Sequence, residues 1–350
     1  MSIEDTRLDM TRKQLGFFTR VLDQVPAAQR YELALEQITT AETEGFDAVA
    51  VAQHHFDGDE GGLPSPLVFL AQAAARTSRV RLTTGVITLA LESPVRVAED
   101  AVVLDVLSGG RLELGFASGG SPTAFATFGL DFAERREIFA ANLATVEAAL
   151  GGEEVGQGAV LYPGAQSLAQ RLWIATFSAP WAIEAGRRGH GLMLSRTQPR
   201  EDGRSLADVQ NELIDAYLEH LPSGVAPRIS VARSLFVADD HDQARAFAET
   251  GLRGAGFVRT ITGQDPAALS VDELIAATDA HVGDPAAVIA TLGADSALAR
   301  ATHLSFQVHS IDPPHAYILR SIQLTAREVA PALGWAPAPG HGRDHAAAAR

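Results

Sequence analysis

Short apolar runs alternate along the chain with longer stretches in which apolar residues recur at helical spacing. The apolar runs predict about eight strands, at 15–19, 47–52, 80–89, 111–117, 172–176, 192–195, 229–238 and 304–308. The amphipathic stretches predict helices at 29–44, 67–77, 95–107, 133–150, 180–188, 203–220 and 314–333. Residues 159–164 (AVLYPG) predict a short hairpin. Strict alternation of strands and helices predicts a parallel sheet with helices outside it.

About eight such repeats favour closure into a (β/α)₈ barrel, the TIM-barrel fold, over an open doubly wound sheet. An open sheet would also carry a Gly-rich dinucleotide fingerprint after its first strand, and the sequence has none there. No break in composition divides the chain. We therefore interpret 1–334 as a single barrel domain, with a mainly helical insertion at about 240–298. The composition of residues 335–350 predicts a disordered tail. Two histidines lie in it, His341 and His345, and we predict no metal site there.

Composition narrows the function classes. Hydrophobic residues make up 46% and charged residues 20%, as in ordinary globular proteins. The net charge of −15 argues against nucleic acid and anionic membranes as partners. No segment is long and apolar enough to cross a bilayer. The first residues are acidic and lack the charged-then-apolar pattern of a secretory signal peptide, so we expect a cytoplasmic protein. The chain has no cysteine and no His-Glu-x-x-His spacing, and we predict no metal site.

The stretch 46–58 (FDAVAVAQHHFDG) places polar groups at the end of a buried strand. The apolar run Ala48–Ala52 stops at Gln53, His54 and His55. Barrel enzymes carry their reactive groups at the carboxyl ends of the strands. An imidazole has an unperturbed pKa of roughly 6.5, so it can give and take protons near neutrality. We expect one histidine to act on a cofactor bound here; the alternative is a core histidine paired with the backbone.

Four long segments occur in a recognisable order and spacing: 44–56 (EGFDAVAVAQHHF), 92–119 (ESPVRVAEDAVVLDVLSGGRLELGFASG), 172–196 (LWIATFSAPWAIEAGRRGHGLMLSR) and 282–292 (VGDPAAVIATL). Together they resemble the bacterial luciferase-like flavin monooxygenases, which are (β/α)₈ barrels that bind reduced FMN. The resemblance leaves 120–170 and 197–280 uncovered.

The resemblance implies roles for residues around the second and third strands. His54 matches the family histidine that lies beside the isoalloxazine ring and acts as an acid/base group. His55 points the other way along the strand, so it is either a catalytic helper or structural. Gln53 either hydrogen-bonds the flavin or ends the strand. Gly85-Val86 matches a non-proline cis peptide that faces the flavin, and a glycine bulge is the alternative.

The resemblance places the flavin phosphate after the fifth strand. Ser178 and the backbone amides from Ala179 to Trp181 would bind it at a helix start, although Ser178 also suits a helix N-cap. Trp181 replaces a hydroxyl residue that some members have. Ser118 stands where bacterial luciferase has a phosphate-binding arginine, and it offers only a neutral hydrogen bond. Arg196 is therefore our candidate for the missing cation, and the alternative is an ordinary surface arginine.

Two loops near the predicted site, Asp57–Pro66 and Ser118–Phe128, would cover it as a lid. Phe125, Phe128 and Phe132 would then line an apolar substrate pocket. Plain packing of helix and loop is the alternative for both features.

By this resemblance, the chain is a flavin-dependent monooxygenase that inserts one oxygen atom of O₂ into a small organic substrate. A separate flavin reductase would supply the reduced FMN, and the protein would form a homodimer through its early helices. Two other functions stay open. One is hydride transfer with the deazaflavin F420, which relatives with the same barrel use. The other is flavin binding without catalysis.

Overall fold

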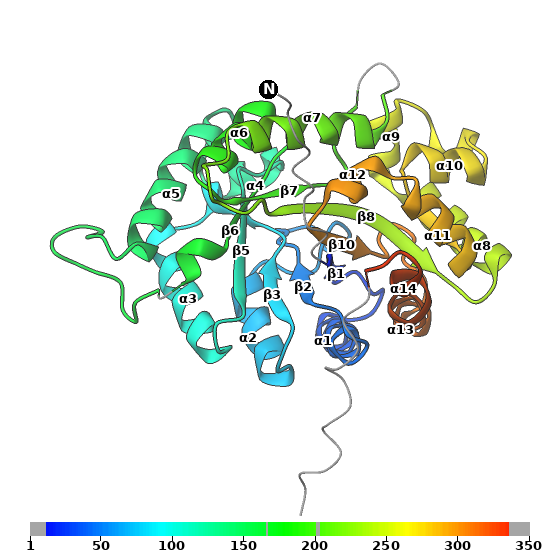
Figure 1. The fold of residues 1–350 in the computed structure, drawn as a ribbon, viewed down its shortest axis with the longest axis horizontal. Coiled ribbons are helices and arrows are strands. Elements are labelled where there is room, and N and C mark those ends of the chain that lie inside the picture. The colour runs from blue at the N-terminus through cyan, green and yellow to red at the C-terminus, as the bar shows by residue number, and fades with distance from the viewer. Residues whose placement is uncertain (1–11, 166, 201–203, 336–350) are drawn as a thin grey trace, which may run out of the picture.

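The computed structural model describes residues 12–165, 167–200 and 204–335 (Figure 1). Its centre is a barrel of parallel strands: β1 (Gln14–Thr19), β2 (Ala48–Val51), β3 (Arg81–Thr84), β5 (Leu112–Ala117), β6 (Leu172–Ala175), β7 (Gly191–Leu194), β8 (Ile229–Val237) and β10 (His303–Gln307). Neighbours pair in this order, and β10 pairs with both β8 and β1, which closes the ring. The predicted (β/α)₈ barrel is confirmed.

Helices surround the barrel: α1 (Ala27–Thr43), α2 (Pro66–Arg76), α3 (Pro94–Leu107), α5 (Arg135–Leu150), α6 (Ala179–Arg187), α7 (Leu206–Glu219), α11 (Pro285–Gly293) and α13 (His315–Leu324). Proline occupies the first turn of α2, α3, α6 and α11, where its missing N–H costs nothing. The predicted last helix is less regular than expected. It continues from α13 through a π turn (Thr325–Val329) into α14 (Ala330–Ala332).

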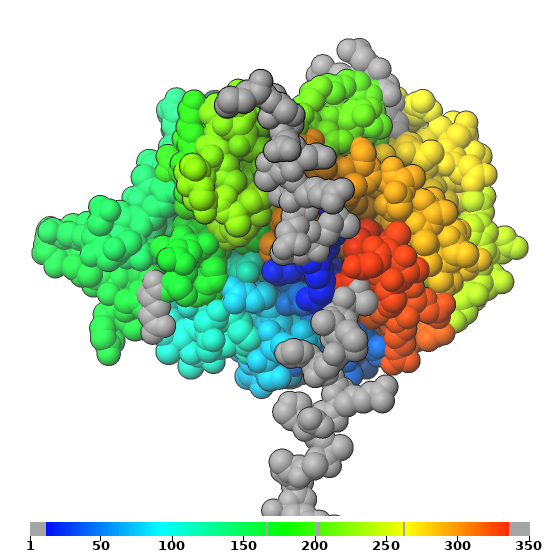
Figure 2. Space-filling model, viewed as in Figure 1, coloured from blue at the N-terminus to red at the C-terminus, as the bar shows by residue number. Residues whose placement is uncertain are grey.

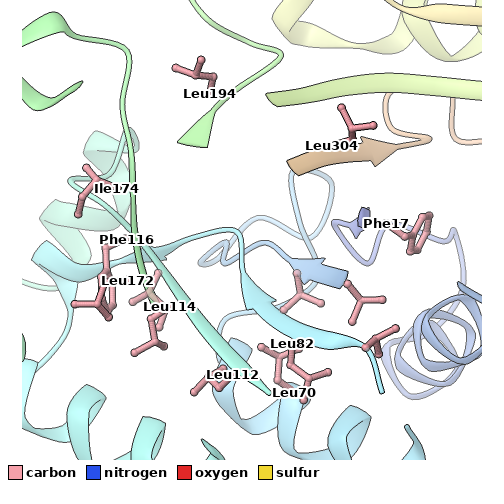
Figure 3. Packing of buried hydrophobic residues seen from close by; sticks show 14 of the residues in the cluster. Phe17, Leu70, Leu82, Leu112, Leu114, Phe116, Leu172, Ile174, Leu194 and Leu304 are labelled. Atoms are coloured by element: carbon pink, nitrogen blue, oxygen red, sulfur yellow. The ribbon is translucent and has the colours of Figure 1, made fainter. Parts of the chain in front are cut away.

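Alternation along the strands separates a packed core from an inner cavity. On β5, Leu112, Leu114 and Phe116 are fully buried in the hydrophobic cluster shown in Figure 3. The residues between them point the other way, and Glu113 and Ala117 line the cavity. Inward positions on the other strands are mostly small: Gly16, Ala50, Thr83, Ala175, Ala232 and Ser305. Small side chains leave the inside of the barrel partly empty, which creates room for a ligand.

The third strand is shorter than predicted. It divides into β3 and β4 (Ile87–Thr88), with Gly85-Val86 between them. The segment 118–128 was expected to be loop, but it contains the short helix α4 (Pro122–Thr127), which Ser121 caps. The predicted hairpin at 159–164 is wrong: these residues form no strand. They belong to a segment that projects from the body next to α5 (Figures 1 and 2).

Between 240 and 298 lie α8 (His241–Gly254), α9 (Gly256–Thr262), α10 (Val271–Ala277), β9 (His281–Gly283), α11 and α12 (Ser296–Arg300). The strand β9 was not predicted, since three residues are too few for a pattern; it pairs with the end of β8. Helices α8 to α10 bury a small core of their own around Phe236, Leu252 and Leu274. In contrast, α11 and α12 pack into the main core. The interpretation of 240–298 as an insertion stays a prediction.

The boundary of the predicted tail needs one correction. Trp335 is only 7% exposed, and its ring stacks on Phe306 with centroids 6.1 Å apart, so this residue belongs to the core. The rest of the predicted tail, with His341 and His345, lies outside the described residues. Among the helices that the structure describes, none has the length and apolar content to span a membrane.

Candidate functional site

A cavity of about 1070 Å³ lies inside the barrel and among the residues that follow the strands at their carboxyl ends. All the predicted site residues except Ala179 and Arg196 line this cavity: Gln53, His54, His55, Gly85, Val86, Ser118, Ser178 and Trp181. Residues more than 100 positions apart therefore meet around one space, as the closed barrel predicts.

His54 follows β2 and is held on three sides. Arg20, from the end of β1, places its Nη2 atom 3.0 Å from His54 Nε2. The backbone N–H of His54 donates to the Leu63 carbonyl at 3.0 Å. Gly61 lies against the ring, because a Cβ there would be 2.1 Å from His54 Cδ2. His54 therefore lines the cavity in a fixed orientation.

The surroundings of His54 change the expected acid/base chemistry. Burial is the main reason that its pKa falls from 6.5 to about 3, and the positive charge of Arg20 lowers it further. The expectation of a histidine that titrates near neutrality is therefore wrong. At neutral pH the ring is uncharged, so it offers one N–H donor and one acceptor but no additional proton.

His55 lies among aromatic rings. Its ring meets that of Phe128 edge-on, with centroids 5.0 Å apart, and that of Phe56 at 5.8 Å. Its Nε2 atom is buried and has no hydrogen-bond partner among the described residues. A buried nitrogen without a partner costs free energy unless a ligand pairs with it. His55 lines the cavity, and its role as a catalytic helper stays a prediction.

Gln53 has a structural role that uses both hydrogens of its amide. Nε2 donates to the Pro64 carbonyl at 3.1 Å and to Glu92 Oε1 at 2.7 Å. Oε1 accepts the backbone N–H of Thr88 at 2.7 Å. Both amide hydrogens are engaged, so the predicted hydrogen bond from Gln53 to a flavin has no free donor. The alternative, that Gln53 ends the strand, agrees better with these contacts.

The peptide bond Gly85-Val86 is cis, which confirms the predicted geometry. The Gly85 N–H donates to the Val51 carbonyl at 2.8 Å, which holds the bond beside β2. A Cβ at Gly85 would lie 2.9 Å from Cε2 of Phe18, so only glycine lets these groups approach so closely. Its contact with a flavin stays a prediction.

Ser178 precedes α6 and stays available to a ligand. Its side chain makes no capping hydrogen bond to α6, and its Oγ lies 3.2 Å from Thr176 Oγ1. Pro180 has no N–H, so among the amides predicted to bind phosphate only those of Ala179 and Trp181 can donate. The hydroxyl and these two amides lie at the positive end of the α6 dipole.

Arg196 is not placed as the sequence suggested. It is only 2% exposed and does not line the cavity, so it is neither a phosphate ligand there nor a surface arginine. Its guanidinium lies 4.6 Å above the Phe257 ring, and Nη2 donates to Ser310 Oγ at 3.3 Å. Nη1 is buried without a partner among the described residues. Burial, with Arg20 nearby, lowers the pKa of Arg196 to about 9.

Two arginines that sequence reasoning missed line the cavity at the start of α5. Arg135 lies 4.0 Å over the Phe132 ring, and Arg136 is exposed with no partner among the described residues. One turn further along α5, Phe139 packs on Trp181 with ring centroids 4.7 Å apart. This contact brings the arginine pair to the α6 side of the cavity. Their signal was an Arg-Arg pair at the start of a long predicted helix, within the segment that the resemblance does not cover.

The loop 57–66, predicted as a lid, is fastened to its surroundings. The Tyr31 hydroxyl donates to the Gly62 carbonyl at 3.0 Å, and Arg30 Nη1 donates to the Gly58 carbonyl at 2.8 Å. The N–H of Gly62 donates to the carbonyl of Arg20 at 3.2 Å. These bonds tie the loop to β1 and α1, and they favour plain packing, the alternative interpretation, over a moving lid.

The three phenylalanines expected in the pocket separate into two groups. Phe125 and Phe132 line the cavity and meet edge-on, with centroids 5.4 Å apart. Phe128 does not line it; this residue is 44% exposed, and its ring packs against those of His55 and Phe56. The apolar wall is therefore smaller than predicted.

The inner end of the cavity is polar, which the sequence did not reveal. Glu113 accepts hydrogen bonds from Trp173 Nε1 and Arg81 Nε, each at 2.9 Å. The His303 ring meets Trp173 edge-on at 4.7 Å, and burial lowers the His303 pKa to about 4. These residues are far apart in the chain, and only the barrel brings them together.

The fold and the cavity define an α/β-barrel protein with a small-molecule site at the carboxyl ends of its strands. A family model described as luciferase-like monooxygenase matches residues 14–303, and the chain belongs to this family. The resemblance noted in the sequence is thereby confirmed.

Known relatives agree with this membership. The chain is 32% identical to 4-hydroxyprotoasukamycin monooxygenase of Streptomyces nodosus subsp. asukaensis over 213 residues, which are 57% of each protein. It is 40% identical to an F420-dependent glucose-6-phosphate dehydrogenase of Kineococcus radiotolerans over 106 residues, 29% of this chain and 30% of that one. These matches span no more than about three fifths of the relatives' length. The crystal structure of the monooxygenase RslO1 from Streptomyces bottropensis superimposes with a TM-score of 0.76 at 27% identity, covering 91% of this chain and 99% of that one.

Proposed function

We propose that the protein is a flavin-dependent monooxygenase that uses reduced FMN and O₂ to oxygenate a small organic substrate. The observation that carries this proposal is one cavity of about 1070 Å³ with different chemistry on its sides. His54 and the cis peptide bond lie on one side, and the α6 amides with the arginine pair lie on the other. An elongated cofactor with a planar ring and an anionic tail matches this division.

The residues present agree with an FMN site. The hydroxyl of Ser178 and the amide of Trp181 would bind the phosphate, and Arg135 or Arg136 would supply the positive charge that Ser118 lacks. Reduced FMN, when bound, supplies the electrons that activate O₂. The chain's own contribution is to orient the ring, to offer the neutral His54 as a hydrogen-bond donor, and to exclude water from the barrel.

A separate flavin reductase would supply the reduced FMN. We infer this partner from the family resemblance. A cavity large enough for FMN agrees with a flavin that is reduced elsewhere and then binds here. The substrate would lie against the apolar wall that Phe125 and Phe132 form.

The decisive experiment mixes the protein anaerobically with reduced FMN and then admits O₂. A monooxygenase should delay the return of oxidised-FMN absorbance, and it should release less than one equivalent of H₂O₂ when substrate is present. The variant His54→Gln, which loses the oriented N–H donor of the ring, should keep its flavin affinity but lose oxygen transfer by about 10²-fold or more. Immediate reoxidation with stoichiometric peroxide release would count against the proposal, and a collapse of FMN binding in His54→Gln would contradict the role of His54.

Hydride transfer with F420 is the second candidate, and the match to an F420-dependent dehydrogenase favours it. Mass and absorption of the cofactor that co-purifies with the chain, together with titration against both cofactors, separate the two. Binding of flavin with unchanged oxidation in His54→Ala would instead favour a non-catalytic flavin-binding protein.

We also propose a homodimer formed through α2 and α3. The outer faces of these helices carry apolar side chains that are largely exposed in the single chain: Val68 at 74%, Val103 at 47%, Val106 at 53% and Leu107 at 71%. The two helices pack side by side, with Val68 in the first turn of α2 and the other three residues toward the end of α3.

A further inference from the structure

The contact between Arg20 and His54 determines where the imidazole carries its proton. A guanidinium has only donors, so the His54 Nε2 atom that lies 3.0 Å from Arg20 Nη2 must be the acceptor. A neutral imidazole has one N–H, which then resides on Nδ1. Nδ1 has no hydrogen-bond partner among the described residues and is not a buried atom, so a molecule in the cavity can reach it.

Both partners of this contact are fixed by the chain around them. Arg20 Nη2 also donates to the Glu60 carbonyl, and the Arg20 carbonyl accepts the N–H of Gly62 at 3.2 Å. Gly61 packs against the His54 ring so closely that no side chain is allowed there. A 180° turn of the ring about its Cβ–Cγ bond would place Cε1 instead of Nε2 opposite Arg20, and it would therefore break this contact.

The charges around His54 come from three parts of the chain. Arg20 follows β1. His309 and Asp312 follow β10 and contact each other at 2.6 Å. His55, Asp57 and Glu60 lie in the loop after β2. The pKa of His54 is lowered by burial, then by Arg20, His309 and His55, and is raised only by Asp57. Arg20 is thus the largest charge effect on this ring.

We propose that Arg20 is a positioning residue that holds His54 as the neutral Nδ1–H tautomer, so that the ring presents a permanent N–H donor to the cavity. His54 then acts by orienting and polarising a ligand oxygen or nitrogen, and not by releasing the proton of an imidazolium. The use of this donor toward flavin rests on the proposed function. The fixed tautomer itself depends only on the contact between Arg20 and His54.

The tautomer is tested by ¹⁵N NMR of the full-length protein labelled at histidine, with the His54 signals assigned from their absence in His54→Gln. The native protein should show a protonated Nδ1 and an unprotonated Nε2 that stay unchanged from pH 8 to 5. In Arg20→Met the two tautomers should mix, and the pKa of His54 should rise by about one pH unit or more. Arg20→Lys should restore most of the native tautomer, because an ammonium group is also only a donor.

Arg30→Met is the matched control, because Arg30 also binds this loop, through the Gly58 carbonyl, and does not contact His54. It should leave the His54 signals as in the native protein. A native His54 protonated on Nε2, or an identical tautomer and pKa in Arg20→Met, would overturn the proposal.

A second measurement follows the delay in FMN reoxidation between pH 5 and 8. In the native protein this delay should show no pH dependence from His54, because the ring does not titrate in this range. In Arg20→Met the delay should change with pH, around the pKa of His54 that NMR gives for this variant. If no protein variant delays reoxidation, the proposed function fails but the NMR result still decides the role of Arg20. If the NMR shows the expected change and the delay in Arg20→Met does not follow it, His54 is not the donor to the flavin.

Discussion

At the scale of single residues, burial decides chemistry that residue type leaves open. His54 was selected because histidine titrates near neutrality, but the folded chain keeps it neutral. Gln53 was a candidate ligand, but both of its amide hydrogens are bound inside the protein, by Pro64 and Glu92. Position along the strand was predictable because the apolar run ends at these residues. Their partners were not, because Arg20, Glu92 and Thr88 come from other elements.

Arg196 gives a stability prediction at this scale. It is buried without a carboxylate partner among the described residues, so Arg196→Met should leave the free energy of unfolding unchanged or raise it by about 1–2 kcal/mol. Arg233 is the matched control, since it is equally buried but pairs with Asp295 at 2.7 Å. Arg233→Met should cost about 3–5 kcal/mol. Urea unfolding of both variants makes the comparison.

The stability difference between the native protein and Arg196→Met should depend on pH in a definite direction. The pKa of Arg196 is lowered to about 9 in the folded chain, so the unfolded chain holds this proton more tightly above that pH. Native stability should therefore recover as the pH rises through 9, and the advantage of Arg196→Met should shrink from pH 8 to 10.5. An advantage that grows over this range, or a large loss of stability in Arg196→Met at pH 7, would contradict the assignment of an unpaired buried charge.

At the scale of elements, the predictions for loops and short helices differed most from the structure. The loop after β2 was expected to move as a lid, but hydrogen bonds from Arg30 and Tyr31 fasten it. The segment after β5 was expected to be irregular, but α4 occupies it. Periodicity identified the long helices well because each has one apolar face. Loops have no such period, and their structure depends on distant donors and acceptors.

The start of α5 carries the prediction at the element scale. If Arg135 and Arg136 replace the cation that Ser118 cannot supply, the double change to Gln should weaken FMN binding by about ten- to a hundredfold, the effect of two charge-assisted contacts. Riboflavin, which lacks the phosphate, should bind the variant and the native chain equally. Calorimetric titration with both ligands checks this. A parallel loss of riboflavin affinity would mean that the arginines support the structure of the cavity and not a phosphate.

At the scale of the whole molecule, the proposed dimer makes a prediction about assembly. Leu107→Asp together with Val68→Asp should produce monomers, because each change places a charge on an apolar surface that a second copy would cover. Val160→Asp is the control, since Val160 is also largely exposed but lies on the segment that projects beside α5. Light scattering of native and variant proteins measures the mass. A native monomer, or dimers that survive both changes, would exclude this interface.

The sequence by itself determined the closed barrel and placed most of its candidate site residues on the wall of one cavity. It could do so because strand and helix periods, strand ends and glycine positions are local properties of a chain. Only the tertiary structure decided the charge of His54, the burial of Arg196 against Phe257, and the presence of Arg135 and Arg136 in the same cavity as Ser178 and Trp181. These properties depend on solvent exclusion and on contacts between distant segments, and neither leaves a pattern along the chain.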